Sequence, residues 1–236
     1  MTAKQPRMGG RAARHALRSA PIPPDERPVQ PGQSGGRFQP LSQSDVDRVH
    51  HAALDALETI GLANALPSQV ELFTQAGCSM SEDGRLKFPR ALVEDTVASA
   101  ARTIVLHGQE ERYDLDLSGE RVYFGTAGAA VHVVDIEKRA YRDSTISDLY
   151  DAARLVDRME HIHFFQRSMV PRDLEDPREM DFNTCYASVH GTTKHVGTSF
   201  VLPEHADESI DMLELIAGGE KLWRERPFVS CSCCFV

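Results

Sequence analysis

The chain has 236 residues, of which 41% are hydrophobic and 26% charged, enough for one sizeable core and a smaller module. Its 35 acidic and 26 basic residues give a net charge of −9, which argues against nucleic acid or an anionic membrane surface as the main partner. No apolar run reaches the ~18 residues that a membrane span needs. The five cysteines are odd in number, unlike a secreted disulfide framework, so we expect a soluble, cytoplasmic protein.

The first 40 residues differ in composition from the rest of the chain. They hold seven basic and two acidic residues, seven prolines and the pairs Gly9-Gly10 and Gly35-Gly36. Such a segment buries little apolar surface, which is typical of an extended arm. An Arg-rich start also resembles an organelle transit peptide, but the prolines beyond residue 20 argue against an amphipathic targeting helix.

Residues 41–120 predict a small α+β module. The stretch "PLSQSDVDRVHHAALDALETIGL" predicts a helix that is capped by Ser42 and ends at Gly61. Its apolar positions fall on one stripe, which consists of Val46, Val49, Ala53, Leu57 and Ile60. Further helices are expected over 69–76 and 89–100, and short strands within "TIVLHG", "RYDLDL" and "RVYFGTAG".

From residue 121 the pattern changes to alternating strands and helices. A strand over 121–126 and a hairpin over 131–144 come first. The helices are then expected over 145–158, 178–189 and 204–217, and the strands over 161–169, 194–200 and 227–235. Alternation of this length predicts βαβ units and a parallel sheet, so the expected fold class is α/β.

The number of strands leaves two architectures open. Residues 121–236 provide four strands, whereas a complete β/α barrel needs roughly 250 residues. The last strand, "FVSCSCCFV", would leave an apolar edge that a folded protein ordinarily covers, and this favours half a barrel over a small open sheet. We therefore predict an extended arm over 1–40, a lead-in module over 41–120, and the first four strands of a TIM-type barrel over 121–236.

Four stretches carry a family resemblance: "RVYFGTAGAAVHVVD", "YRDSTISDLYDAARLVDRMEHIHFFQRSMVPRD", "GTTKHVGTSF" and "IAGGEKLWRERPFVSCSCCFV". Together with "GGRAARHAL" near the start, they make the chain resemble the amino-terminal half of the trimethylamine methyltransferase family. That family includes members acting on quaternary amines such as glycine betaine. The resemblance implies a complete β/α barrel that transfers a methyl group from a methylated amine to the cobalt of a separate corrinoid protein.

The same resemblance implies that parts of the active protein lie outside this chain. The corrinoid (cobalamin) is carried by the partner protein, so no cofactor is expected on this chain. The family's pyrrolysine lies in the second half of the barrel, and this chain leaves open whether that position holds pyrrolysine or an ordinary residue. Without strands five to eight we expect the chain to be inactive by itself. A half-barrel that is catalytically silent, completed by a second chain or self-associated through the 227–236 edge, is the non-enzyme alternative.

The motif "EHIHFFQRSMVP" raises a rival hypothesis, a metal-dependent barrel hydrolase that uses His161 and His163. Two histidines at positions i and i+2 of a strand share one face and can bind a metal ion. In β/α barrels, however, the chemistry takes place at the carboxyl ends of the strands. Because the two histidines begin their strand, we expect them at the barrel floor and predict no metal site.

The same polarity selects the candidate substrate-binding residues, and no residue is assigned a catalytic role. Glycines after the first strand let the backbone approach a ligand, hydroxyl groups can donate hydrogen bonds, and only one of two successive side chains can face the barrel mouth. The candidates are Gly125, Thr126, Gln166, Arg167, Thr198 and Ser199. Lys194 and His195 begin the third strand and are expected in the bottom loop.

Two further groups of side chains allow a functional and a structural interpretation. Aromatic rings suit a methylated ammonium ion, and the candidates are Tyr123, Phe124, Phe165 and Phe200, each also suited to a core. The "SCSCC" stretch puts Cys231 and Cys233 on one face of a strand and Cys234 on the other. This spacing does not fit a zinc site built from loops, so we expect the cysteines to pack in the core.

Overall fold

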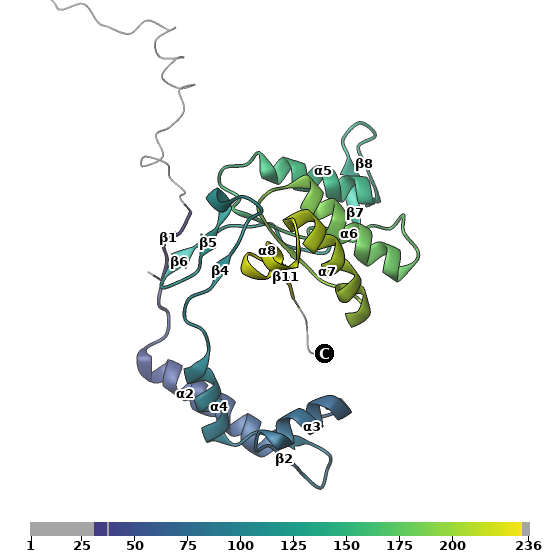
Figure 1. The fold of residues 1–236 in the computed structure, drawn as a ribbon. Coiled ribbons are helices and arrows are strands. Elements are labelled where there is room, and N and C mark those ends of the chain that lie inside the picture. Colours follow the sequence, from purple (N-terminus) through teal and green to yellow (C-terminus); the bar gives the residue numbers. More distant parts are fainter. Residues whose placement is uncertain (1–30, 37, 233–236) are drawn as a thin grey trace, which may run out of the picture. The chain divides into compact units, whose positions relative to one another are not determined.

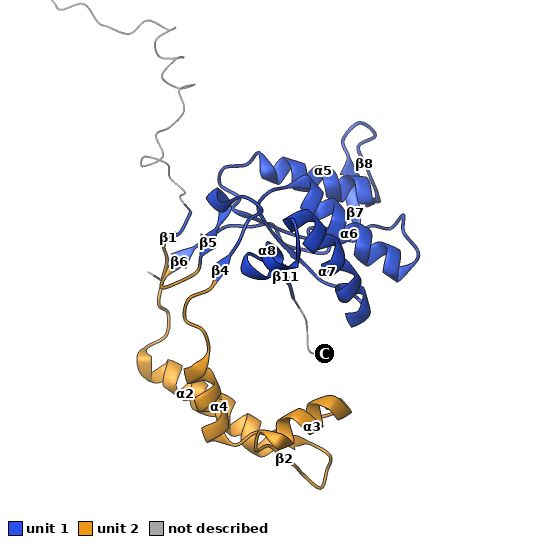
Figure 2. Ribbon diagram, in the orientation of Figure 1, with its two compact units in different colours: residues 1–33, 105–116, 121–236 blue, residues 34–104, 117–120 orange. Residues whose placement is uncertain are grey.

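A computed structural model describes residues 31–36 and 38–232 (Figure 1). The chain divides into two compact units (Figure 2). The helical unit consists of residues 34–104 and 117–120, and the sheet unit consists of residues 1–33, 105–116 and 121–236. Residues 105–116, which the sequence places in the lead-in module, thus cluster with the sheet unit. Most of the arm expected over 1–40 lies outside the described residues.

The helical unit contains the helices that the lead-in module predicts. They are α2 (Gln43–Asp55), the π-helical turn η2 (Ala56–Ile60), α3 (Pro67–Gln75) and α4 (Arg90–Ser99). A short hairpin joins β2 (Ser79–Met80) to β3 (Leu86–Lys87). Ser42 caps α2 as predicted, since its hydroxyl accepts from the Asp45 N–H while the Asp45 carboxylate accepts from the Ser42 N–H.

The predicted apolar stripe of α2 is not the buried face of this helix. Val49 is 62% exposed and Ile60 57% exposed, whereas Leu54, outside the stripe, is 2% exposed. The π-helical turn supplies part of the reason, because an i→i+5 turn breaks the 3.6-residue period on which the stripe was drawn. Within the described residues the stripe therefore faces no core.

The sheet unit begins with short antiparallel pairs. β4 (Val105–Leu106) pairs with β5 (Leu115–Asp116), and the 3₁₀ turn η3 (Glu111–Tyr113) lies between them. β1 (Gln33–Ser34) pairs with β6 (Arg121–Val122). β7 (His132–Asp135) and β8 (Ala140–Asp143) form the predicted hairpin, in which Val134 lies opposite Tyr141. In Figure 1 this hairpin projects from the unit.

The main sheet is parallel and follows chain order. β9 (Phe164–Gln166), β10 (His195–Thr198) and β11 (Val229–Cys231) are neighbours in that sequence. Isolated parallel bridges join Gly125 to Phe164 and Ala130 to Met169, so the chain after β6 runs alongside β9. Four successive segments therefore run in the same direction, as the βαβ alternation predicts. No sheet of the described residues is closed, and the barrel remains an expectation.

Helices α5 (Ile146–Asp157), α6 (Pro177–Gly191) and α7 (Pro203–Ala217) occupy the predicted positions. A fourth helix, α8 (Glu220–Glu225), was not predicted. It follows the pair Gly218-Gly219, whose positive φ angles of 89° and 133° end α7 and redirect the chain. None of the helices within residues 31–36 and 38–232 combines the length and the apolar character required to cross a bilayer.

Two clusters of buried side chains join the helices to one face of the sheet. The first cluster surrounds Phe165 and consists of Leu149, Ala153, Val156 and Ala187. The second cluster surrounds Val196 and consists of Cys185, Val189, Leu213 and Phe228. Burying a side chain of this size contributes about 1.5–3 kcal/mol. Since neighbouring residues of a strand point to opposite faces, Phe164, Gln166, His195 and Gly197 lie on the other face of the sheet, which we call the open face.

The prediction that the cysteines of "SCSCC" pack in the core is wrong for Cys231, the one cysteine of this stretch among the described residues. Cys231 is exposed, because β11 is the edge of the sheet. Cys233 and Cys234 lie outside the described residues. The cysteine that packs in the core is Cys185, on α6, and burial raises the pKa of its thiol to about 12.

Candidate functional site at the carboxyl ends of the parallel strands

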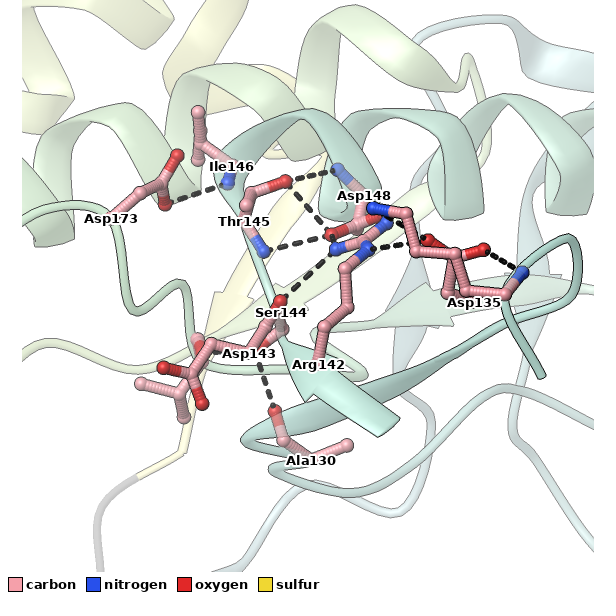
Figure 3. A network of polar contacts seen from close by, with 11 residues as sticks. Ala130, Asp135, Arg142, Asp143, Ser144, Thr145, Ile146, Asp148 and Asp173 are labelled. Carbon is pink, nitrogen blue, oxygen red and sulfur yellow. Dashed lines mark hydrogen bonds and ion pairs between the residues drawn. The ribbon is translucent and has the colours of Figure 1, made fainter. Parts of the chain in front are cut away.

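The segments that follow the parallel strands are held by a network of charged hydrogen bonds (Figure 3). Arg142, at the end of the β7–β8 hairpin, makes two 2.6 Å hydrogen bonds to the two carboxylate oxygens of Asp148. Asp148 also closes a capping box with Thr145 at the start of α5. The Arg142 guanidinium and the Thr145 donors hold the pKa of Asp148 well below its usual range despite partial burial.

The same network extends to the segment after β9. The Asp173 carboxylate accepts a 3.0 Å hydrogen bond from the Ile146 N–H, the free end of α5. The Ser144 hydroxyl donates to the Val170 carbonyl at 2.7 Å. Figure 3 shows the Asp173–Ile146 contact beside the Arg142–Asp148 pair. The hairpin, the start of α5 and the segment after β9 are therefore tied together at this end of the sheet.

Two glycines on the open face give room to side chains of β9. A Cβ atom added at Gly125 would overlap the ring of Phe164, and one added at Gly197 would overlap the side-chain oxygen of Gln166. Phe164 and Gln166 therefore lie across the backbones of the neighbouring strands on either side. The space above Gly125, which the sequence suggested for a ligand, is taken by Phe164.

Hydrogen bonds fix two other candidates. The Thr126 hydroxyl donates to the Gln166 carbonyl at 2.6 Å, so it bridges two strand ends. The Arg167 N–H donates to the Gly197 carbonyl at 2.9 Å, and its side chain follows Gln166 on the opposite side of the strand. Asp173, further along the same segment, accepts a hydrogen bond from the Ile146 N–H.

Thr198 and Ser199 end the third parallel strand. Thr198 has no exposed surface and shares the helix-covered face with Val196. Its hydroxyl has no hydrogen-bond partner within the described parts of the chain. Ser199 follows the strand and is half-buried. The structure thus directs Thr198 toward the helices and Gln166 toward the open face.

Two of the four aromatic candidates lie in the core, and two do not. Phe165, on β9, is fully buried against α5 and α6, and Phe200 packs against the second core cluster. The Tyr123 hydroxyl donates to the Asp116 carbonyl at 3.0 Å. Phe124 is 42% exposed. Phe165 and Phe200 therefore serve the core.

His161 and His163 precede β9 at the amino end of the sheet. The His163 N–H donates to the Phe124 carbonyl at 2.6 Å, and its Nδ1 accepts from the Phe124 N–H at 2.8 Å. Burial, the Lys194 charge and His161 lower the pKa of His163, which keeps the ring neutral. No three His, Cys, Asp or Glu side chains among residues 31–36 and 38–232 are grouped as metal ligands.

Lys194 and His195 also lie at the amino end, as predicted. The Lys194 ammonium is buried and donates to the carbonyls of Val156, Met159 and Ile162 at 2.6–2.7 Å. His195 makes a 2.8 Å hydrogen bond through Nδ1 to the His107 carbonyl. A cavity of about 530 Å³ at this end is lined by Tyr113, Lys194 and other residues. These groups stabilise the floor of the sheet.

The family described as Trimethylamine methyltransferase (MTTB) matches residues 7–234. The chain belongs to this family.

Curated members of the family share its sequence at moderate identity. Trimethylamine methyltransferase MttB of Desulfitobacterium hafniense is 30% identical over 82% of this chain and 39% of the relative. Trimethylamine methyltransferase MttB2 of Methanosarcina mazei is 25% identical over 85% of this chain and 42% of the relative. Glycine betaine methyltransferase of Desulfitobacterium hafniense is 23% identical over 83% of this chain and 40% of the relative. The chain spans about two-fifths of the length of these relatives.

One buried polar group of this methyltransferase-family chain was not predicted from its sequence. Asp181, on α6, has a fully buried carboxylate that accepts from the Val201 N–H at 2.6 Å and contacts His205 Nδ1 at 2.7 Å. It therefore fixes the turn between β10 and α7 at the carboxyl end of the sheet. The sequence signal was a single acidic residue within "MDFNTCYASV", a stretch that holds no other charged side chain.

Proposed function

We propose that the chain is the amino-terminal half of a β/α-barrel methyltransferase of the cytoplasm. Its reaction moves a methyl group from a methylated amine, such as trimethylamine or a quaternary amine, to the cobalt of a separate corrinoid protein. The observation that carries the proposal is the match to the trimethylamine methyltransferase family over residues 7–234. The parallel order of β9, β10 and β11 supports the barrel, because such sheets are built from successive βα units.

The proposed transfer is a displacement at carbon. The carbon–nitrogen bond breaks with its electron pair left on nitrogen, and the new bond forms from an electron pair of the reduced cobalt that the partner supplies. A quaternary ammonium leaves as a neutral tertiary amine and needs no protein acid, whereas trimethylamine leaves as neutral dimethylamine only when it is bound in its protonated form. In this reaction the chain holds the amine, aligns its methyl group with the cobalt and excludes water.

We place the substrate at the carboxyl ends of the parallel strands, among Gly125, Thr126, Gln166, Arg167, Thr198 and Ser199. Ligands of α/β sheets bind at these ends. The Arg142–Asp148 network and the Asp181–Val201 hydrogen bond support this placement, because they make the surrounding segments rigid. The corrinoid needs no site within this chain, since the partner protein carries it.

The complete site, in this proposal, needs more polypeptide than these residues. The chain covers 39–42% of three curated relatives, and four parallel strands enclose only part of a barrel. We infer that the chain by itself is inactive. The non-enzyme alternative is a half-barrel that stays catalytically silent even when a second chain completes it. It differs from this proposal only in that lack of activity.

A methyl-transfer assay tests the proposal. The chain alone, and the longer protein that its gene encodes if the reading frame continues past Val236, are each mixed with reduced corrinoid protein and a methylated amine. Trimethylamine and glycine betaine are tested separately, and transfer is followed by the change in corrinoid absorbance. We expect transfer by the longer protein and little by the chain alone. The proposal would be overturned if the longer protein transferred a methyl group neither from trimethylamine nor from glycine betaine. Unreduced corrinoid protein is the control.

A further inference from the structure

The outward face of α6 carries aromatic rings where a helix in water ordinarily carries charged side chains. Beyond the first turn of this helix, the exposed positions are Phe182, Tyr186 and His190. They recur every four residues and form one row along the helix, which we call the aromatic stripe. Phe182 is 36% exposed and Tyr186 is 45% exposed. A contiguous exposed apolar surface is typical of a site at which another molecule binds.

The rings of the aromatic stripe are ordered by stacking. His190 lies between the rings of Tyr150, on α5, and Tyr186, with ring centroids 5.6 Å and 5.3 Å apart and interplanar angles of 12° and 8°. The same three rings, together with Ile146 and Asn183, line a groove of about 350 Å³. Ordered aromatic rings beside a groove are suited to anchor a protein interface, because they bury a large area at a small cost in conformational entropy.

The fold leaves this face of α6 open to a separate molecule. The opposite face of the helix packs on the sheet through Cys185 and Val189. On its two flanks α6 is in contact with α5 and α7 (Figure 1). The helices of a β/α barrel form a single outer ring. Helices from later strands would therefore lie beside those described and would not cover the aromatic stripe.

The amino end of the aromatic stripe is acidic. Glu179 and Asp211 line a cavity of about 420 Å³ together with Phe182. Arg178 lines the same cavity, but its guanidinium is already paired with the Glu208 carboxylate at 2.7 Å. The charge that this end offers to a partner is therefore negative.

The other end of the aromatic stripe is basic. Arg158, which follows α5, is exposed and lines a cavity of about 520 Å³ with His190. Of the two acidic residues at this cavity, Asp151 pairs with Arg154 at 3.2 Å, and the half-buried Asp157 accepts hydrogen bonds from the threonines that follow α6. The charge that this end offers to a partner is therefore that of the Arg158 guanidinium.

This distribution of charge fits a second copy of the chain. An isologous interface brings one surface against itself, and a two-fold axis that crosses the middle of the aromatic stripe, close to Tyr186, turns the stripe end for end. Arg158 of each copy then faces Glu179 and Asp211 of the other. We propose that the aromatic stripe is the interface of a homodimer, with Tyr186 near its axis. This inference does not depend on the proposed function.

Substitutions on the stripe and a matched control test the dimer, which sedimentation velocity of the 236-residue chain measures. Tyr186→Glu brings two carboxylates together near the axis. Tyr141→Glu makes the same chemical change outside the stripe, at a tyrosine of β8 that is 80% exposed. Arg158→Glu and Glu179→Arg are made singly and together, so that the double variant carries the proposed ion pair with its charges exchanged. Thermal unfolding of each variant checks that it is folded.

We expect the chain to form a dimer with a dissociation constant of about 10 μM or lower. Tyr186→Glu should raise this constant by about thirtyfold or more, because a central aromatic anchor is lost and two like charges meet, whereas Tyr141→Glu should leave it unchanged. Arg158→Glu and Glu179→Arg should each raise it about tenfold. The double variant should return to within about threefold of the unsubstituted chain, since opposite charges face each other again.

Three results would overturn this inference, whether or not the protein transfers methyl groups. The first is a chain that stays monomeric at about 100 μM, well above the expected dissociation constant. The second is a dimer that Tyr186→Glu leaves intact, because it then forms through another surface such as the edge at β11. The third is a double variant that dimerises no better than its two single variants, because the two copies are then not related end for end.

Discussion

At the scale of single residues, the two buried histidines at the amino end of the sheet carry their proton on different ring nitrogens. His163 Nδ1 accepts from the Phe124 N–H, so the proton of its neutral ring lies on Nε2. His195 Nδ1 faces the His107 carbonyl and must donate, which leaves Nε2 to accept from the Ser230 hydroxyl. The direction of these hydrogen bonds, not the residue type, selects each tautomer.

We expect nitrogen-15 NMR to show opposite tautomers for His163 and His195. Both pKa values are lowered, by burial first and, for His163, by the charge of Lys194. A folded histidine with a lowered pKa binds protons less readily than the unfolded chain, so its contribution to stability is lost as the pH falls below about 6.5. A proton on Nδ1 of His163 at neutral pH would contradict the structure.

At the scale of elements, the starts of α2 and α5 were predictable because a cap is a local property. Ser42 and Thr145 lie three residues before Asp45 and Asp148, and both pairs form capping boxes. The short strands are less predictable: "HIHFFQRSM" suggested a strand over 161–169, yet only Phe164–Gln166 pairs regularly with β10. The length of a strand depends on its neighbour, which local sequence does not contain.

The Arg142–Asp148 pair should stabilise the start of α5 by more than an ordinary surface ion pair. We expect Asp148→Asn to lower the free energy of unfolding by about 1–2 kcal/mol at pH 7, because it weakens the cap and the two charged hydrogen bonds. The folded pKa of Asp148 lies below its unfolded value, so its contribution is present above about pH 4 and is lost as the pH falls further. Urea unfolding at pH 7 and pH 3 measures both effects.

Asp151→Asn is the matched control on the same helix. Asp151 is exposed, and among the described residues it pairs only with Arg154, at 3.2 Å and one turn away, a contact that contributes about a few tenths of a kcal/mol. An equal loss of stability in Asp148→Asn and Asp151→Asn at pH 7 would show that the network at the start of α5 adds nothing.

At the scale of the whole molecule, the two units differ in how much apolar surface each buries. The buried apolar side chains described for the helical unit are Leu54, Cys78 and Leu86. Those of the sheet unit form two clusters under α5, α6 and α7. Because burial is the main source of stability, the helical unit should open more readily.

Hydrogen exchange followed by mass spectrometry tests this difference. We expect the backbone amides of α2, α3 and α4 to exchange faster than those of α5 and α6. Peptides from β10, which lies between two other strands, are the slow reference within the same sample. Equal protection of α2 and α6 would show that burial within each unit does not govern its opening.

The sequence by itself determined the alternation of strands and helices after residue 121, the cap of α2, and the family resemblance, because each depends on residues close together in the chain. It could not select among the candidate site residues. Gln166 and Arg167 are adjacent, and only the packing of Phe165 against the helices decides that Gln166 faces the open side. The tertiary structure also decided that Thr198 is buried, that Gly125 and Gly197 make room for Phe164 and Gln166, and that Asp181 fixes a turn twenty residues away. These facts depend on contacts between distant segments, and no local pattern specifies which segments will meet.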